Sequence, residues 1–146
     1  MSDRAHMHMT IGGQILSIRI PTLAALALEY HCSPEWDGEP ITEADIVPGK
    51  PLELMAMEIP GGMADKLEAF CRENLLPYSR WSGACWGAFN AEIDYYEGKG
   101  EVANFAADDD ARPMMHIDQL AKIETIDELK AAIAPAAFVV PPLTII

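Results

Sequence analysis

The sequence predicts a single α+β domain that holds a mostly antiparallel sheet of about five strands, with helices on one face. Half of the 146 residues are hydrophobic, and a chain of this length and composition can close one core. Short runs with period-two alternation indicate half-buried strands, and longer runs with helical spacing indicate helices. Three strands follow one another before two helices, and this order favours an α+β arrangement.

The N-terminal half begins with a polar stretch that is rich in Met and His, and we expect residues 1–10 to be a flexible terminus. Apolar and polar residues then alternate up to Pro21, which predicts a strand over 11–20. A buried helix is expected over 23–30. Residues 32–51 hold four prolines and two glycines and predict a long loop.

The central part of the chain contains the clearest periodic patterns. A mostly apolar run over 52–59 predicts a second strand, and apolar positions at helical spacing predict a helix over 63–74. Three more strands are expected over 78–82, 89–96 and 101–106.

The C-terminal third is expected to be helical. Asp118 can cap a short helix, and the capping box formed by Thr125 and Glu128 begins a second one. The main domain is therefore assigned to residues 11–134, and residues 135–146 form an extended apolar tail. We favour docking of this tail on its own sheet, and a homodimer through the tail is the alternative.

The charge of the chain is strongly unbalanced, because 23 acidic residues against 10 basic ones give a formal net charge of -13. A compact domain of this composition has a negative surface, which repels nucleic-acid phosphates and anionic lipids and attracts cations. The basic residues are scattered and no two are adjacent, so a phosphate-binding stripe is not expected. We therefore expect a basic protein partner, with no direct nucleic-acid binding and no membrane association.

The number and spacing of the cysteines and histidines indicate the cellular compartment and whether a metal site is expected. The N-terminus lacks the apolar region of a secretory signal peptide, and three irregularly spaced cysteines argue against a disulfide framework. We expect a cytoplasmic protein. The Cys and His residues lack zinc-site spacing, and the glycines form no nucleotide-binding motif. We expect neither a metal nor another cofactor.

An aromatic and acidic group in the middle of the chain is the predicted partner-binding site. Trp81 and Trp86 flank a glycine-rich turn, and alternation places Tyr96 outward on a strand. Glu92 and Asp94 share one face of that strand. Trp and Tyr commonly anchor protein interfaces. The alternatives are a core role for the aromatic residues and a solvated face for the two acids.

These expectations fit a non-catalytic interaction protein that binds a basic protein. Two short segments, SPEWDGEP and FNAEIDYYEGKG, resemble uncharacterised proteins of bacterial mobile elements, which implies an accessory or inhibitor protein of a phage or plasmid. The alternative is a small enzyme or small-molecule-binding domain with a site between the 32–51 loop and the 82–87 turn. Cys85, His31 and Glu92 would be the residues to test there.

Overall fold

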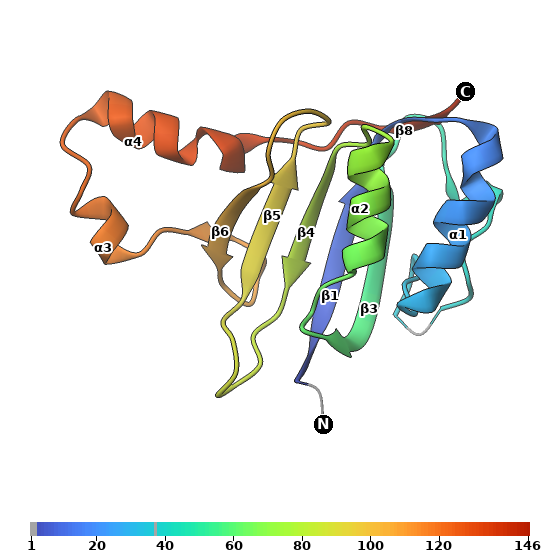
Figure 1. The fold of residues 1–146 in the computed structure, drawn as a ribbon, viewed down its shortest axis with the longest axis horizontal. Coiled ribbons are helices and arrows are strands. Elements are labelled where there is room, and N and C mark those ends of the chain that lie inside the picture. The colour runs from blue at the N-terminus through green and yellow to red at the C-terminus, as the bar shows by residue number, and fades with distance from the viewer. Residues whose placement is uncertain (1–2, 37) are drawn as a thin grey trace.

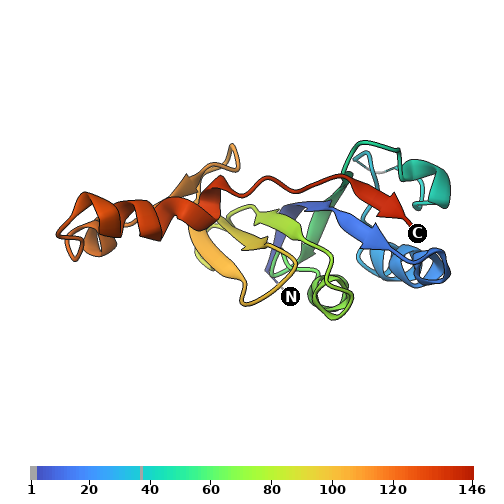
Figure 2. The same ribbon diagram turned by 90° about the horizontal axis from the view of Figure 1, so that it is seen from above.

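A computed structural model describes residues 3–36 and 38–146. Helices α1 (Ile20–Glu29) and α2 (Asp65–Glu73) lie against one face of an antiparallel sheet (Figure 1 and Figure 2). The predicted α+β class is confirmed. The sheet has six strands, in the spatial order β3 (Leu52–Pro60), β1 (Arg4–Ile11), β4 (Tyr78–Ser82), β5 (Glu92–Tyr96), β6 (Ala103–Ala107) and β7 (Pro113–Met114).

The N-terminal strand β1 lies inside the sheet, between β3 and β4. Met7, Met9 and Ile11 are fully buried toward the helices. The expectation of a flexible terminus over 1–10 is therefore wrong for residues 4–10, while residues 1 and 2 lie outside the described part of the chain. The physical reason is that methionine is apolar, so the alternating Met and His residues bury one complete strand face.

The strand predicted over 11–20 is also wrong. The chain turns at Gly13, whose φ of 93° is one that residues with a side chain rarely adopt. The short strand β2 (Gly13–Ile15), the 3-10 turn η1 (Ser17–Arg19) and the start of α1 follow. Leu16 and Ile18, which alternation placed inside, are exposed. The remaining predicted strands and helices form close to their expected positions.

The hydrophobic core lies between the two helices and strands β3, β1 and β4. Burial of this apolar surface supplies the main favourable contribution to folding. Its fully buried members include Met7, Met9, Ile11, Leu23, Leu54, Leu67, Leu76 and Tyr78.

The C-terminal tail docks on its own chain. Strand β8 (Leu143–Ile145) pairs in parallel with β2, and Leu143 is fully buried. Gly12 lies so close to the tail that a Cβ built on it would meet the carbonyl oxygen of Pro141 at 2.0 Å. A homodimer through residues 135–146 stays a prediction, and it would have to use the surface that the docked tail leaves exposed.

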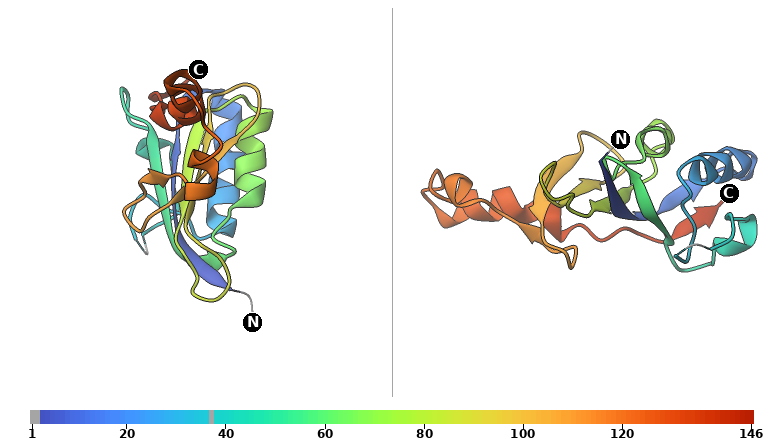
Figure 3. Two further views of the ribbon diagram at one scale, coloured as in Figure 1. Left: turned by 90° about the vertical axis from the view of Figure 1, so that its left-hand side faces the viewer. Right: turned by 90° about the horizontal axis from the view of Figure 1, so that it is seen from below.

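Helices α3 (Ile117–Leu120) and α4 (Ile126–Ile133) do not cover a face of the sheet. They extend beyond its β6 edge, and the chain returns through the 3-10 turn η3 (Ala134–Ala137), as the two views of Figure 3 show. No residue between 97 and 139 is buried. We call residues 113–139 the C-terminal arm. Within residues 3–36 and 38–146, no helix has both the length and the apolar character that a membrane crossing requires.

Candidate functional site

A buried arginine organises the polar residues of the sheet. Strand β4 alternates, so that Tyr78, Arg80 and Ser82 face the helices while Ser79 and Trp81 face away. Only 1% of the Arg80 side chain is exposed. An arginine buried to this extent requires partners for its charge and for its five N–H donors.

Three carboxylates and one hydroxyl surround the guanidinium group of Arg80. Its Nε donates to Glu68 of α2 at 2.8 Å. Its Nη2 donates to Asp94 at 2.7 Å and to Glu92 at 3.3 Å, and its Nη1 donates to Ser82. The register between β4 and β5 explains this arrangement, because Asp94 lies opposite Arg80 and Glu92 lies opposite Ser82.

The three carboxylates differ in burial. The exposed fraction of the side chain is 5% for Glu68, 16% for Asp94 and 34% for Glu92. Burial raises the pKa of Glu68, although the charge of Arg80 acts in the opposite direction. Burial alone would lower the pKa of Arg80, but the surrounding carboxylates outweigh it, and the pKa is raised.

The charge of this cluster is unequal. Three carboxylates share one guanidinium, so the cluster carries a net charge of about −2 when all of its groups are ionised. The excess lies toward Glu92 and Asp94, which are the two more exposed acids. A further cation at this position would be attracted.

Glu92 and Asp94 occupy a part of the sheet that α2 leaves open. They point to the helical face, but α2 lies in front of β1 and β3, and no described helix lies over β5 and β6 (Figure 1). Asn104 of β6 lies opposite Asp94 on the same face of the sheet. Its side-chain amide donates to Asp94 at 2.6 Å and to Glu92 at 2.9 Å. The amide orients both carboxylates, each of which has further acceptor positions.

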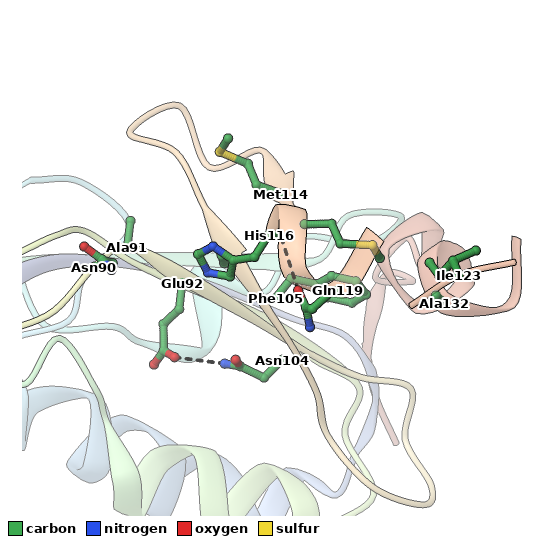
Figure 4. Close-up of a pocket in the computed structure, with 12 residues that line it drawn as sticks. Asn90, Ala91, Glu92, Asn104, Phe105, Met114, His116, Gln119, Ile123 and Ala132 are labelled. Carbon is green, nitrogen blue, oxygen red and sulfur yellow. Dashed lines mark hydrogen bonds between the residues drawn. The ribbon is translucent and has the colours of Figure 1, made fainter. Parts of the chain in front are cut away.

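A cavity of about 540 Å³ adjoins this group (Figure 4). Asn104, Phe105 and Ala106 all line it. Alternate side chains of a strand point to opposite faces, so a cavity that meets three consecutive residues lies along the edge of the strand. The cavity therefore reaches the edge of β6, and it extends to the start of β5, where residues 90–92 also line it.

The two sides of this cavity differ in chemistry. Glu92 and Asn104 supply a carboxylate and an amide on one side, and the C-terminal arm supplies the polar His116 and Gln119 together with apolar side chains on the other (Figure 4). An acceptor beside apolar walls suits a cationic group on an aliphatic stem, such as a lysine or arginine side chain. The apolar side chains that line the cavity include Phe105, Met114, Met115, Ile123 and Ala132.

The structure does not bring the five predicted partner-binding residues into one patch. Glu92 and Asp94 share a face of β5, as predicted. Tyr96 is only 3% exposed, so its predicted outward placement is wrong. It lies opposite Tyr78 on the covered part of the same face, and the two ring centroids are 5.6 Å apart.

The two predicted tryptophans occupy different surroundings. Trp81 faces the other side of the sheet from the carboxylates, and its Nε1 donates to the carbonyl of Asp108 at 3.0 Å. Trp86 lies in the loop between β4 and β5 and is fully exposed. Of these two tryptophans, Trp86 is the one available for contact with a partner, and it does not line the cavity beside β6.

The alternative site between the 32–51 loop and the 82–87 turn has no common cavity among the described residues. His6 of β1 lies between them, because its ring contacts Trp36 and its carbonyl accepts a hydrogen bond from Gly83. His31 lines a separate cavity of about 240 Å³ that the turn does not reach.

Cys85 is partly exposed, whereas the other two cysteines are buried. Within residues 3–36 and 38–146, no three His, Cys, Asp or Glu side chains gather in an arrangement that could hold a metal ion. Cys32 and Cys71 are buried, and burial raises the pKa of both thiols, that of Cys32 to about 12. Neither is therefore a thiolate at neutral pH.

Glu68, Arg80 and Asn104 were not predicted to be members of a site. One signal was present, because Arg80 has the inward parity of Tyr78, and a charge at an inward position requires an opposite charge nearby. The register of β4, β5 and β6, which places Arg80, Asp94 and Asn104 in one row, is a property of the folded sheet.

No protein-family model, no curated protein and no solved structure matches this chain.

Proposed function

We propose that this chain is a non-catalytic interaction protein whose cavity beside β6 receives basic side chains of a protein partner. The observation that supports this most strongly is the unequal charge of the Arg80 cluster beside an open cavity. A lysine or arginine of the partner would supply the missing positive charge. Hydrogen bonds between ionised groups are stronger than those between neutral groups.

The rest of the surface supports the same class of partner. Ion pairs among the described residues occupy six carboxylates, which leaves most of the 23 acidic residues without a basic neighbour at salt-bridge distance. The resulting negative potential would steer a basic protein toward the chain and accelerate its association. The six paired acids are Glu29, Glu68, Glu92, Asp94, Asp108 and Asp110.

Binding is favoured over catalysis by the position of the perturbed group. A general acid must lie within hydrogen-bonding reach of the substrate. Glu68, whose pKa is raised, lies on the buried side of α2 and does not line the cavity. The most specific form of the proposal is an accessory or inhibitor protein of a phage or plasmid that presents carboxylates in place of nucleic-acid phosphates.

A direct test uses a fluorescein-labelled decapeptide of lysine, arginine and glycine, with a glutamate analogue as its counterpart. Fluorescence anisotropy should detect binding of the basic peptide only. The affinity should fall steeply as salt is raised, because salt screens charges over about 8–10 Å at physiological ionic strength. Equal binding of the acidic peptide, or binding that is insensitive to salt, would refute the proposal.

Two double variants with the same change in net charge locate the binding site. Glu92→Gln with Asp94→Asn should weaken binding by roughly tenfold or more, because two charged acceptors are lost. Glu43→Gln with Glu53→Gln changes two exposed acids elsewhere and should reduce affinity by no more than about threefold. If both variants weaken binding equally, only the net charge matters, and the cavity is not the site.

A further inference from the structure

One side of β6 is only partly used for hydrogen bonding. The amide of Ala107 donates to the carbonyl of Ala91 on the β5 side at 3.0 Å. In an antiparallel ladder the bonded residues recur at every second position, so Phe105 and Ala103 also bond toward β5. The backbone N–H and C=O of the intervening Asn104 therefore point away from β5.

Strand β7 pairs with the C-terminal end of β6 on that outer side and does not extend further along it. Ala106 pairs with Met114, and the amide of Asp108 donates to the carbonyl of Arg112 at 3.1 Å. Asn104 is next in the same row, and none of the described segments provides a backbone partner on this side of it. Beyond Met114 the chain turns into α3, and His116 and Gln119 of this segment line the cavity together with Asn104.

The opposite edge of the sheet is protected. Met55 of β3 exchanges two backbone hydrogen bonds with Ser33, at 3.1 and 2.8 Å. The side chains of His6 and Arg4 on the neighbouring strand β1 reach the carbonyls of Met57 and Glu58, where the register between β1 and β3 shifts. Open strand edges readily pair with another chain, and proteins usually cover or block them. Among residues 3–36 and 38–146, the backbone of Asn104 has no partner on its outer side, although η3 lies close to β6.

The geometry points to this edge of β6 as a strand-addition site: an extended segment of the basic partner joins the sheet antiparallel to β6 and in line with β7. This inference rests on the proposed function and adds the mode of recognition. Backbone hydrogen bonds to Asn104 hold the segment, and its side chains alternate between the two faces of the sheet.

Alternation defines the sequence of that segment. The residue opposite Asn104 has its side chain on the face that carries Glu92 and Asp94, and it is therefore basic. Its two neighbours point to the other face, beside Phe105, and they are apolar. The partner presents alternating basic and apolar residues in an extended conformation.

Synthetic peptides test the strand geometry. A hexapeptide of alternating lysine and valine is compared with one of the same composition in which three lysines precede three valines. In antiparallel addition every lysine N–H points to β6 and every valine N–H points away. Methylation of the lysine amides should therefore weaken binding by roughly tenfold or more, and methylation of the valine amides should leave it within about threefold.

Two variants of Asn104 test the protein side. Asn104→Pro removes the outward N–H, and proline is tolerated on an edge strand whose N–H faces solvent. Asn104→Ala removes only the side chain and is the matched control. Proline should weaken binding of the alternating peptide by roughly tenfold relative to alanine. In the wild-type protein, the peptide should slow hydrogen exchange at the amide of Asn104.

The outcomes separate this inference from the proposed function. If the block-ordered peptide binds as tightly as the alternating one, or if methylation at both sets of positions has the same effect, strand addition is overturned while recognition of basic groups stands. If saturating peptide leaves the hydrogen exchange of the Asn104 amide unchanged, strand addition is likewise overturned while recognition of basic groups stands. If neither peptide binds the wild-type protein, the proposed function itself fails.

Discussion

Replacement of Arg80 by methionine tests whether the guanidinium group is what permits three carboxylates to share one side of the sheet. Methionine is unbranched and flexible, so it fills much of the volume that arginine leaves. The substitution removes the positive charge and its donors. Glu68, with 5% of its side chain exposed, then lacks a cationic partner among the described residues, and Glu92 and Asp94 lose theirs.

The expected cost is large for a single substitution. Removal of one partner from a buried ion pair typically costs about 3–5 kcal/mol, because the remaining charge stays buried without compensation. A domain of this size has a total free energy of unfolding of about 5–15 kcal/mol. The corresponding fall in Tm is roughly 6–20 °C, at about 2–4 °C per kcal/mol for chains of this length.

Urea unfolding followed by tryptophan fluorescence measures this cost at pH 7 and at pH 4.5. The loss in Arg80→Met should be smaller at the lower pH, because carboxylates without a cation take up protons more readily. The double variant Glu68→Leu with Arg80→Met removes the most buried acid as well and should recover part of the loss. A cost below about 1 kcal/mol at pH 7 would refute the role assigned to Arg80.

Three further predictions concern the rest of the chain. Leu143→Ala should lower the free energy of unfolding by about 2–5 kcal/mol, because Leu143 is fully buried. Ile126→Ala, at an exposed position on the arm, should change it by no more than about 0.5 kcal/mol, and urea unfolding measures both variants. Equal costs would contradict the docked tail. The raised pKa of Glu68 contributes stability that is fully present below the ordinary glutamate pKa of about 4.3 and is lost as the pH rises through the raised value. The stability of the wild type relative to Glu68→Gln should therefore decline as the pH increases above about 4.3, and a constant difference across the titration would contradict the shift. In native protein a thiol reagent should label Cys85, which is partly exposed, well before the two buried cysteines, and simultaneous labelling of all three would contradict their burial.

Local patterns were sufficient for most of the elements. The strand at 78–82 has its predicted bounds, and the helix over 63–74 forms as α2 within that range. Such segments are recognisable because period two and helical spacing are properties of neighbouring residues. The pattern failed at the N-terminus, where methionine was counted with the polar residues. It failed again over 11–20, where a glycine with positive φ ends the extended chain.

By itself the sequence determined an α+β domain with a large excess of acidic charge, since both follow from composition and from contacts between near neighbours. Only the tertiary structure decided that Glu68, Glu92 and Asp94 meet around Arg80 and that the backbone of Asn104 has no partner on its outer side. Periodicity states which side of a strand a residue faces. It does not state which strand lies alongside, because the pairing is selected by long-range contacts that exist only in the folded chain.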